Sequence, residues 1–202
     1  MQSYDGYNAV VAASKLTHIG CFAHARRKFD EAIKAQGKHP RQGLAHRGLG
    51  LIRKLYGVEK VVRHAKPEVR HAYRQQHARP ILDELRAWLD DSLPQVPPQS
   101  ATGKALHYLH NEWPKLIGYL QDGRLAIDNN AAENAIRPFV VGRKNWLFSD
   151  SVRGVQASAN LYSLIETAKA NGLEPYAYLR RVFTELPLAD TVAAIEALLP
   201  GQ

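Results

Sequence analysis

The chain has 202 residues and a mass of 22.6 kDa, which fits one large domain or a domain that carries an insertion. Its composition, 45% apolar and 23% charged, is that of a folded protein rather than a disordered tail. No apolar run approaches the roughly 18 residues of a membrane span, and the start lacks the order of a secretory signal. The single cysteine, Cys21, excludes an internal disulfide framework and an all-cysteine zinc site, which favours a reducing cytosol.

The positive charge is concentrated in one stretch. The chain carries 27 Lys and Arg against 19 Asp and Glu, a net charge of +8. Residues 41–80 hold ten cations and two acids, so this stretch accounts for the whole excess. A basic stretch of this kind is typical of a polyanion partner, most often nucleic acid. It also fits a solvated helical face that only keeps the protein soluble, and charge alone leaves the two readings about even.

The first third alternates short elements. A turn at Asp5-Gly6 is followed by a small helix over residues 7–13 and by an apolar run, 17–22, that predicts a strand. Helical spacing of Phe29 and Ile33 predicts a helix over 25–35.

The middle reads as a long helical insertion, about 41–120. Leucines at helical spacing predict one helix from Leu44, and prolines predict the starts of two more, at Pro67 and over 80–93. A stiff proline-rich linker, 94–100, precedes a helix capped by Thr102 and interrupted at Pro114.

The last third predicts a helix over 131–136 that Pro138 ends, and an extended segment over 139–148. Three more helices are expected: one over 155–171 that Gly172 closes, one from Glu174 to about Phe183, and one from Asp190 to Leu199. The predicted fold class is therefore mostly α with few strands.

Glu133 is the most informative carboxylate. The spacing Asn130-Ala131-Ala132-Glu133 fits a capping box, in which Glu133 only accepts the Asn130 N–H. The neighbourhood favours a role in binding a phosphodiester, because cations and an aromatic residue follow this acid: Arg137, Arg143, Lys144 and Trp146.

Two other sites remain ambiguous from the residues alone. Asp5 precedes a glycine, as in a common turn, and a divalent ion would need a further carboxylate beside it. Cys21 and His24 have the spacing of two metal ligands, but His18 is the only other nearby donor, so a locally bonded cysteine and histidine are favoured over zinc.

Three long segments resemble insertion sequence 66 family transposases. The first is Gly20-Cys21-Phe22-Ala23-His24-Ala25-Arg26-Arg27-Lys28-Phe29, and the second runs from Ile127-Asp128-Asn129-Asn130 through Glu133 and Arg137 to Phe148. The third, residues 161–175, resembles the C-terminal element of the same family.

The resemblance implies an Asp-Asp-Glu transposase with a ribonuclease H-like core, interrupted by the helical insertion. Asp5 matches the second catalytic Asp of the family and Glu133 its catalytic Glu. These two carboxylates are the implied ligands of Mg²⁺ or Mn²⁺, with Cys21, His24, Asp128, Asn129 and Asn130 as supporting residues. The implied division is a partial catalytic domain, 1–150, and a C-terminal helical element, 151–202. The implied partners are transposon ends and target DNA, together with a second copy of the chain or a full-length transposase. The implied compartment is the bacterial cytosol, and no membrane partner is implied.

No acid precedes Asp5, so the first catalytic Asp of the family has no match here. We expect the chain to correspond to the C-terminal portion of a transposase, with weak metal binding and no DNA cleavage of its own. The alternatives are a non-catalytic basic DNA-binding protein or transposase regulator, and a helical scaffold whose charge is incidental.

Overall fold

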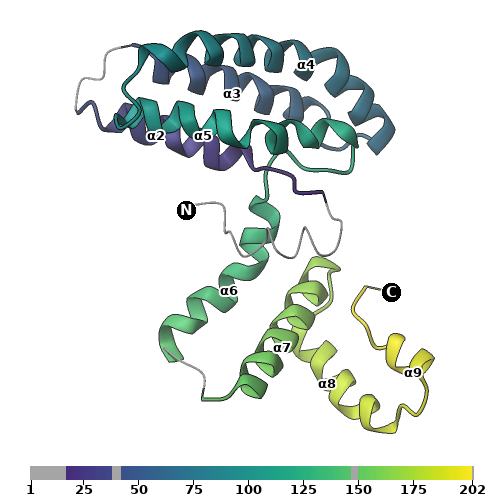
Figure 1. Ribbon diagram of the computed structural model, residues 1–202. Helices are drawn as coiled ribbons and strands as arrows, with labels where there is room; N and C mark the ends of the chain where they lie inside the picture. The colour runs from purple at the N-terminus through teal and green to yellow at the C-terminus, as the bar shows by residue number, and fades with distance from the viewer. Residues whose placement is uncertain (1–16, 38–41, 147–149, 202) are drawn as a thin grey trace. The chain divides into compact units, whose positions relative to one another are not determined.

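The computed structural model describes residues 17–37, 42–146 and 150–201, without the side chains of 143–146 (Figure 1). The chain divides into two compact units after Asn130. All regular elements in the described ranges are helices. The mainly α-helical prediction is therefore confirmed, whereas neither strands nor a ribonuclease H-like core are shown in this part of the chain.

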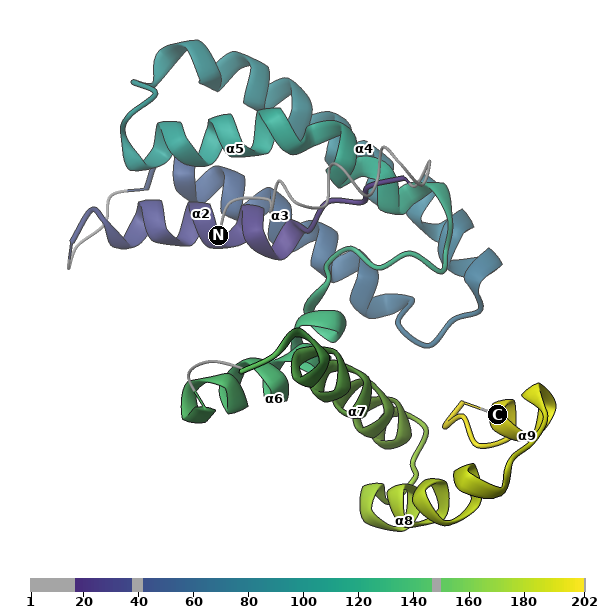
Figure 2. The same cartoon turned by 60° about the horizontal axis from the view of Figure 1, so that its bottom comes forward.

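The first unit contains four long helices: α2 (Phe22–Lys34), α3 (Leu44–Val61), α4 (Pro67–Ser92) and α5 (Ala101–Leu116). Two short 3₁₀ helices, η1 (Leu93–Gln95) and η2 (Ile117–Gln121), follow α4 and α5. Figures 1 and 2 show the long helices side by side, with α2 packed on α3 and α5, and α3 packed on α4. This unit contains most of the predicted helical insertion.

Apolar side chains at helical spacing form one core between these helices. Its fully buried members include Phe22, Phe29, Ile52, Leu55, Leu85, Leu89, Leu106 and Leu109. The centroid of the Phe29 ring lies 6.0 Å from that of the Trp88 ring, and Gly48 of α3 packs directly against both rings. A Cβ atom at Gly48 would lie 2.6 Å from Trp88 and 2.7 Å from Phe29, so glycine is required here by packing.

A buried arginine joins three elements of this unit. Arg74 of α4 is 1% exposed, and its Nε and Nη2 atoms donate to the Glu59 carboxylate of α3 at 2.9 and 2.7 Å. Its Nη1 atom donates to the carbonyl oxygens of Tyr119 and Asp122, at 3.0 and 3.1 Å, at the end of η2. The guanidinium also stacks on the Tyr119 ring, 5.0 Å from its centroid. A buried charge is tolerated when it is paired and hydrogen-bonded in this way.

The second unit begins at Ala131, the second residue of α6 (Asn130–Trp146). It continues with α7 (Val152–Ala170), α8 (Pro175–Glu185), η3 (Leu186–Leu188) and α9 (Val192–Glu196). Its core is small and consists of Ala168, Tyr178, Val182 and Leu198. The Tyr178 hydroxyl donates to the Leu198 carbonyl at 3.0 Å, and the Phe139 ring of α6 meets the Tyr162 ring of α7 edge-on at 5.3 Å.

The predicted strand over 17–22 is wrong, and so is the predicted extended segment over 139–148 as far as the structure describes it. Residues 17–21 are irregular, and α2 begins at Phe22. Single backbone hydrogen bonds hold this segment, from Gly20 to Lys115 and from Phe22 to Ile127, rather than a strand ladder. The segment predicted as extended, 139–148, is helical as far as Trp146. Strand propensity of a run such as Phe139-Val140-Val141 depends on its packing, and here Phe139 packs against a neighbouring helix.

Several helix boundaries that were predicted at prolines are wrong. Pro80 lies inside α4, which is one helix and not two, and Pro114 and Pro138 likewise lie inside α5 and α6. Pro80 and Pro114 are exposed, so water can satisfy the carbonyl groups that lose their helical partner. The segment predicted as a helix over 7–13 lies outside the described residues.

The helix ends predicted from capping residues lie closer to those observed. Gly172 has φ of 74° directly after the C-cap Asn171, as predicted. Glu174 caps α8 by accepting the N–H groups of Tyr176 and Ala177, which lowers the pKa of its carboxyl group. The predicted cap Thr102 is wrong by two positions and the predicted start at Asp190 by one. The N-cap residues are Ser100 and Thr191, whose side chains accept the N–H groups of Gly103 and Ala194.

A search of the described residues finds no helix with the length and apolar character needed to cross a membrane.

We predict that Arg74→Met lowers the free energy of unfolding by about 3–5 kcal/mol, because the Glu59 carboxylate loses its buried partner. Urea denaturation measures this loss as a lower midpoint with an unchanged slope. Arg74→Met/Glu59→Leu should recover most of it, since both charges are then removed.

The matched control is Lys54→Gln, in the exposed pair of Lys54 and Glu84 at 3.3 Å, where we expect a loss below about 1 kcal/mol. Equal losses in Arg74→Met and Lys54→Gln would contradict the anchoring role of Arg74.

Candidate functional site

Asp128 is held in place by a tyrosine from the helical bundle. The Tyr56 hydroxyl, near the end of α3, donates to Asp128 Oδ2 at 2.8 Å. Burial and then this hydrogen bond raise the pKa of Tyr56 well above its ordinary value of 10.0. The phenol therefore stays protonated and remains a hydrogen-bond donor at physiological pH.

The same carboxylate organises the start of α6. The Asn130 N–H donates to Asp128 Oδ1 at 3.2 Å, and the Asn130 side-chain amide donates to Asp128 Oδ2 at 3.0 Å. Asp128 therefore satisfies one of the backbone donors that a helix start leaves open. The capping-box interpretation assigned this N–H to Glu133, whereas in the structure it donates to Asp128.

The segment that begins α2 lies against this loop. The Phe22 N–H donates to the Ile127 carbonyl at 3.1 Å, and the Arg26 guanidinium lies 5.5 Å from the centroid of the Tyr56 ring. Cys21, half-buried, is the N-cap residue of α2. Two segments singled out from the sequence, 20–29 and 127–130, are thus joined directly and through Tyr56.

Glu133 lies in the first turn of α6, three residues after Asn130, and is half-buried. A carboxylate at this position is favoured by the partial positive charge of the helix N-terminus. Arg137, one turn further along, is exposed, as are Asn129 and Asn130.

Several predicted site residues are not tested by the structure. Asp5 lies outside the described residues, as do the side chains of Arg143, Lys144 and Trp146. Whether Asp5 and Glu133 meet therefore stays a prediction. His24 is half-buried in α2.

The described residues do not by themselves complete a metal site. Within them, no three His, Cys, Asp or Glu side chains gather as ligands. The Asp128 carboxylate accepts hydrogen bonds from Tyr56 and Asn130. Glu133 is the second carboxylate of this segment, and carboxylate oxygens are ligands that hard cations prefer. A magnesium site would need Asp5 beside it.

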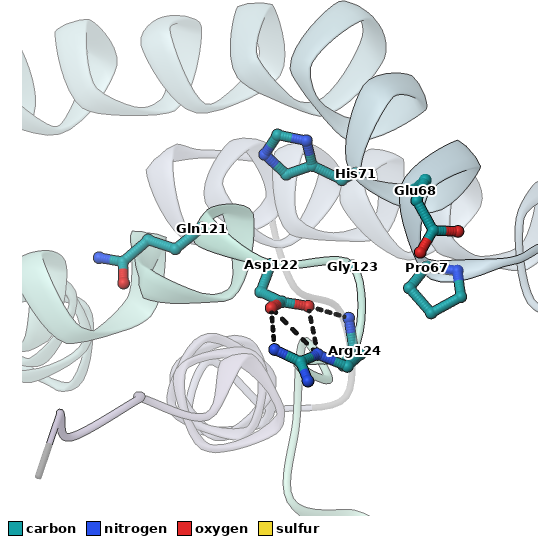
Figure 3. A pocket seen from close by; sticks show the side chains of 7 residues that line it. All are labelled: Pro67, Glu68, His71, Gln121, Asp122, Gly123 and Arg124. Atoms are coloured by element: carbon teal, nitrogen blue, oxygen red, sulfur yellow. Dashed lines mark hydrogen bonds and ion pairs between the residues drawn. The ribbon is translucent and has the colours of Figure 1, made fainter.

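A shallow cavity of about 450 Å³ lies elsewhere in the first unit, between the start of α4 and the end of η2 (Figure 3). Seven residues line it: Pro67, Glu68, His71, Gln121, Asp122, Gly123 and Arg124. Asp122 and Arg124 form an ion pair at 2.6 Å within it, which lowers the pKa of Asp122 to about 2. The charges of these two side chains therefore neutralise each other.

Tyr56 is the residue of this region that the sequence did not single out. Tyr56 lies 72 positions before Asp128 in the chain, and no local pattern links the two. Only the packing of α3 beside the loop reveals their contact.

Comparison with known proteins gives two family matches. The model described as Transposase IS66 family matches residues 1–157, and the model described as IS66 C-terminal element matches residues 163–200. Together they account for nearly the whole chain.

Relatives in Sinorhizobium fredii are similar over the same extent. The uncharacterized protein y4jD is 34% identical over 206 residues, which cover 97% of this chain and 40% of that protein. The uncharacterized protein y4hP is 32% identical over 213 residues, which cover 98% of this chain and 38% of that protein. The chain thus spans about two fifths of the length of these relatives, and no solved structure matches it.

The two family matches, which together cover nearly the whole chain, lead to one assignment: the chain belongs to the IS66 family of transposases.

Proposed function

We propose that the chain forms part of the catalytic machinery of a DNA transposase, with Asp5 and Glu133 as two of its catalytic carboxylates. Family membership supports this proposal. The observation that carries it is the fixed start of α6, where Asp128, held by Tyr56 and Asn130, precedes the turn that contains Glu133. A rigid helix start is a suitable support for a metal-ligating carboxylate.

In this proposal, Asp5 and Glu133 hold Mg²⁺ or Mn²⁺, as divalent metals serve this family in general. The metal, when bound, supplies Lewis-acid activation of the phosphodiester and of the attacking oxygen. The residues of the chain have simpler roles. The two carboxylates would hold the ion against the scissile phosphate, which water and later a DNA 3′-hydroxyl would attack in line, and Asp128 accepts the N–H of the first residue of α6.

DNA contacts are assigned to residues that follow Glu133. Arg137, Arg143 and Lys144 are proposed to bind phosphates, and Trp146 to stack on an unpaired base. Arg137 is exposed on α6, which suits such a contact. Transposon ends and target DNA are the proposed substrates, and the bacterial cytosol the proposed compartment. A second copy or a full-length transposase is the proposed protein partner.

The second candidate function is a non-catalytic DNA-binding protein or transposase regulator. The observation that favours it is the exposed part of the basic stretch, since Arg47, Arg53, Lys60, Arg63 and Lys66 are all exposed. This function needs the positive surface but neither carboxylate.

Our first functional prediction is that this chain alone does not cut DNA, because it has no residue that matches the first catalytic Asp of the family. A nicking assay on supercoiled plasmid with Mg²⁺ or Mn²⁺ should give no cleavage above that of Glu133→Gln. Robust cleavage that disappears in Glu133→Gln would contradict the prediction.

A second prediction separates binding from catalysis. Affinity for a DNA duplex should fall steeply as salt rises, because phosphate contacts release counterions, and Asp5→Ala should leave that affinity unchanged. Fluorescence anisotropy at several salt concentrations measures both. Absence of binding at low salt would rule out the second candidate function and leave the helical scaffold.

A third prediction concerns the support of Glu133. Tyr56→Phe removes one hydrogen bond to a carboxylate and should cost about 1–3 kcal/mol locally. Hydrogen exchange should accelerate in peptides that cover 128–136, with little change in α4 and α5. The control is Tyr108→Phe, which changes a half-buried tyrosine that has no side-chain hydrogen bond to a described residue. Equal acceleration in both variants would show that Tyr56 has no special link to α6.

A further inference from the structure

The structure separates the cations of the basic stretch into two groups. Arg74 is buried against Glu59, Arg70 donates to the carbonyl oxygens of Gly123, Arg63 and Ala65, and Lys54 pairs with Glu84. The others in the described residues are exposed, and three of them, Arg47, Arg53 and Lys60, lie on α3 together with Lys54. The excess charge is therefore displayed mainly along and just after one helix.

The four cations of α3 form two rows. Residues seven apart lie almost above one another on a helix, about 10 Å apart along its axis. Arg47 and Lys54 make one such row, and Arg53 and Lys60 make the other. Between the two rows lies a third, which consists of Gly50 and Gly57. We call these six residues the α3 basic face.

No acid of α3 interrupts this face. The helix contains a single acid, Glu59, and that carboxylate is turned inward onto Arg74. The neighbouring helix contributes Glu84, at 3.3 Å from Lys54, and Asp30 of α2 lies within electrostatic range of Arg53 but pairs with Lys34 at 2.6 Å. The α3 basic face thus keeps a clear positive excess.

Among the residues that the structure describes, no packing contact calls for glycine at position 50 or 57. A Cβ atom at Gly50 or Gly57 would meet no described atom within 4 Å. At Gly48 of the same helix, by contrast, a Cβ atom would collide with Trp88 and Phe29. Glycine inside a helix is destabilising relative to alanine. It is useful where another backbone must approach closely, and here the free space lies between two rows of cations.

We propose that the α3 basic face is a docking surface for the sugar-phosphate backbone of double-stranded DNA, outside the catalytic segment. The charge of the face is complementary to a phosphate strand, which the two rows contact from either side while the glycines let it approach the helix. These contacts position DNA and read no bases. The inference rests on the proposed function only for the identity of the polyanion.

The test measures how tightly the full 202-residue chain binds a 30-base-pair duplex of arbitrary sequence at equilibrium. Fluorescence anisotropy of the labelled duplex reports the binding at several salt concentrations. Arg53→Gln/Lys60→Gln should weaken binding by about tenfold or more and lower the salt slope by about two. The matched control, Lys104→Gln/Arg180→Gln, removes two exposed charges from α5 and α8 and should change affinity by no more than about twofold. Equal losses in the two double variants would overturn the proposal, because the charge would then act diffusely.

A second variant separates docking from folding. Gly57→Ala should raise the melting temperature, because alanine favours the helix and no atom of the described residues blocks its methyl group. It should nevertheless weaken duplex binding several-fold. Unchanged affinity in this variant would exclude close approach of a backbone at Gly57.

Competition identifies the partner. A polyglutamate of the same total charge should displace the duplex far less well than an unlabelled duplex does. Equal displacement would overturn the assignment to DNA. These outcomes are distinct from failure of the proposed catalytic function, since they require no cleavage, and loss of cleavage in a longer protein would leave the binding differences intact.

Discussion

The buried ion pair of Arg74 and Glu59 is the constraint on which the rest of the first unit depends. One guanidinium joins α3, α4 and the end of η2, and its remaining donors are used by the carbonyl groups of Tyr119 and Asp122. A charge that has left water must find these partners together, so the three elements can meet in only one register. The register of α3 in turn sets where Tyr56 lies, and hence where Asp128 is held.

This connection gives the helical bundle a role beyond that of a spacer. In the chain, α3 to α5 separate the Cys21 segment from the loop that begins at Ile127. In space, the bundle brings these segments together through the Phe22 N–H, the Ile127 carbonyl and the Tyr56 hydroxyl. A folding defect in the bundle would therefore reach the start of α6 without a change in any residue of the signature, because the support of Asp128 belongs to α3.

The sequence predicted local structure better than tertiary structure. Gly172 and Glu174 were assigned correctly because helix ends depend on neighbouring residues. The prediction of an extended segment from Phe139 was wrong as far as Trp146, because nothing local in the sequence signals that Phe139 packs on Tyr162. The family resemblance identified Glu133 and Asp128, but the contact of Tyr56 with Asp128 spans 72 positions and required the fold.

The basic stretch shows most clearly what a charge count leaves out. Arg70 and Arg74 contribute to the same net charge as Arg53 and Lys60, yet their guanidinium groups bind carbonyl oxygens and a carboxylate within the unit. They stabilise the bundle and offer little to a partner. Only the cations left on the surface can release counterions from a polyanion. The net charge of +8 therefore overstates the charge that a partner can contact, and that charge is concentrated on part of the surface. Two glycines of α3 differ in the same way. Gly48 is required by the packing of the core, whereas a Cβ atom at Gly57 would meet no described atom within 4 Å, which is consistent with the proposed approach of a phosphate strand.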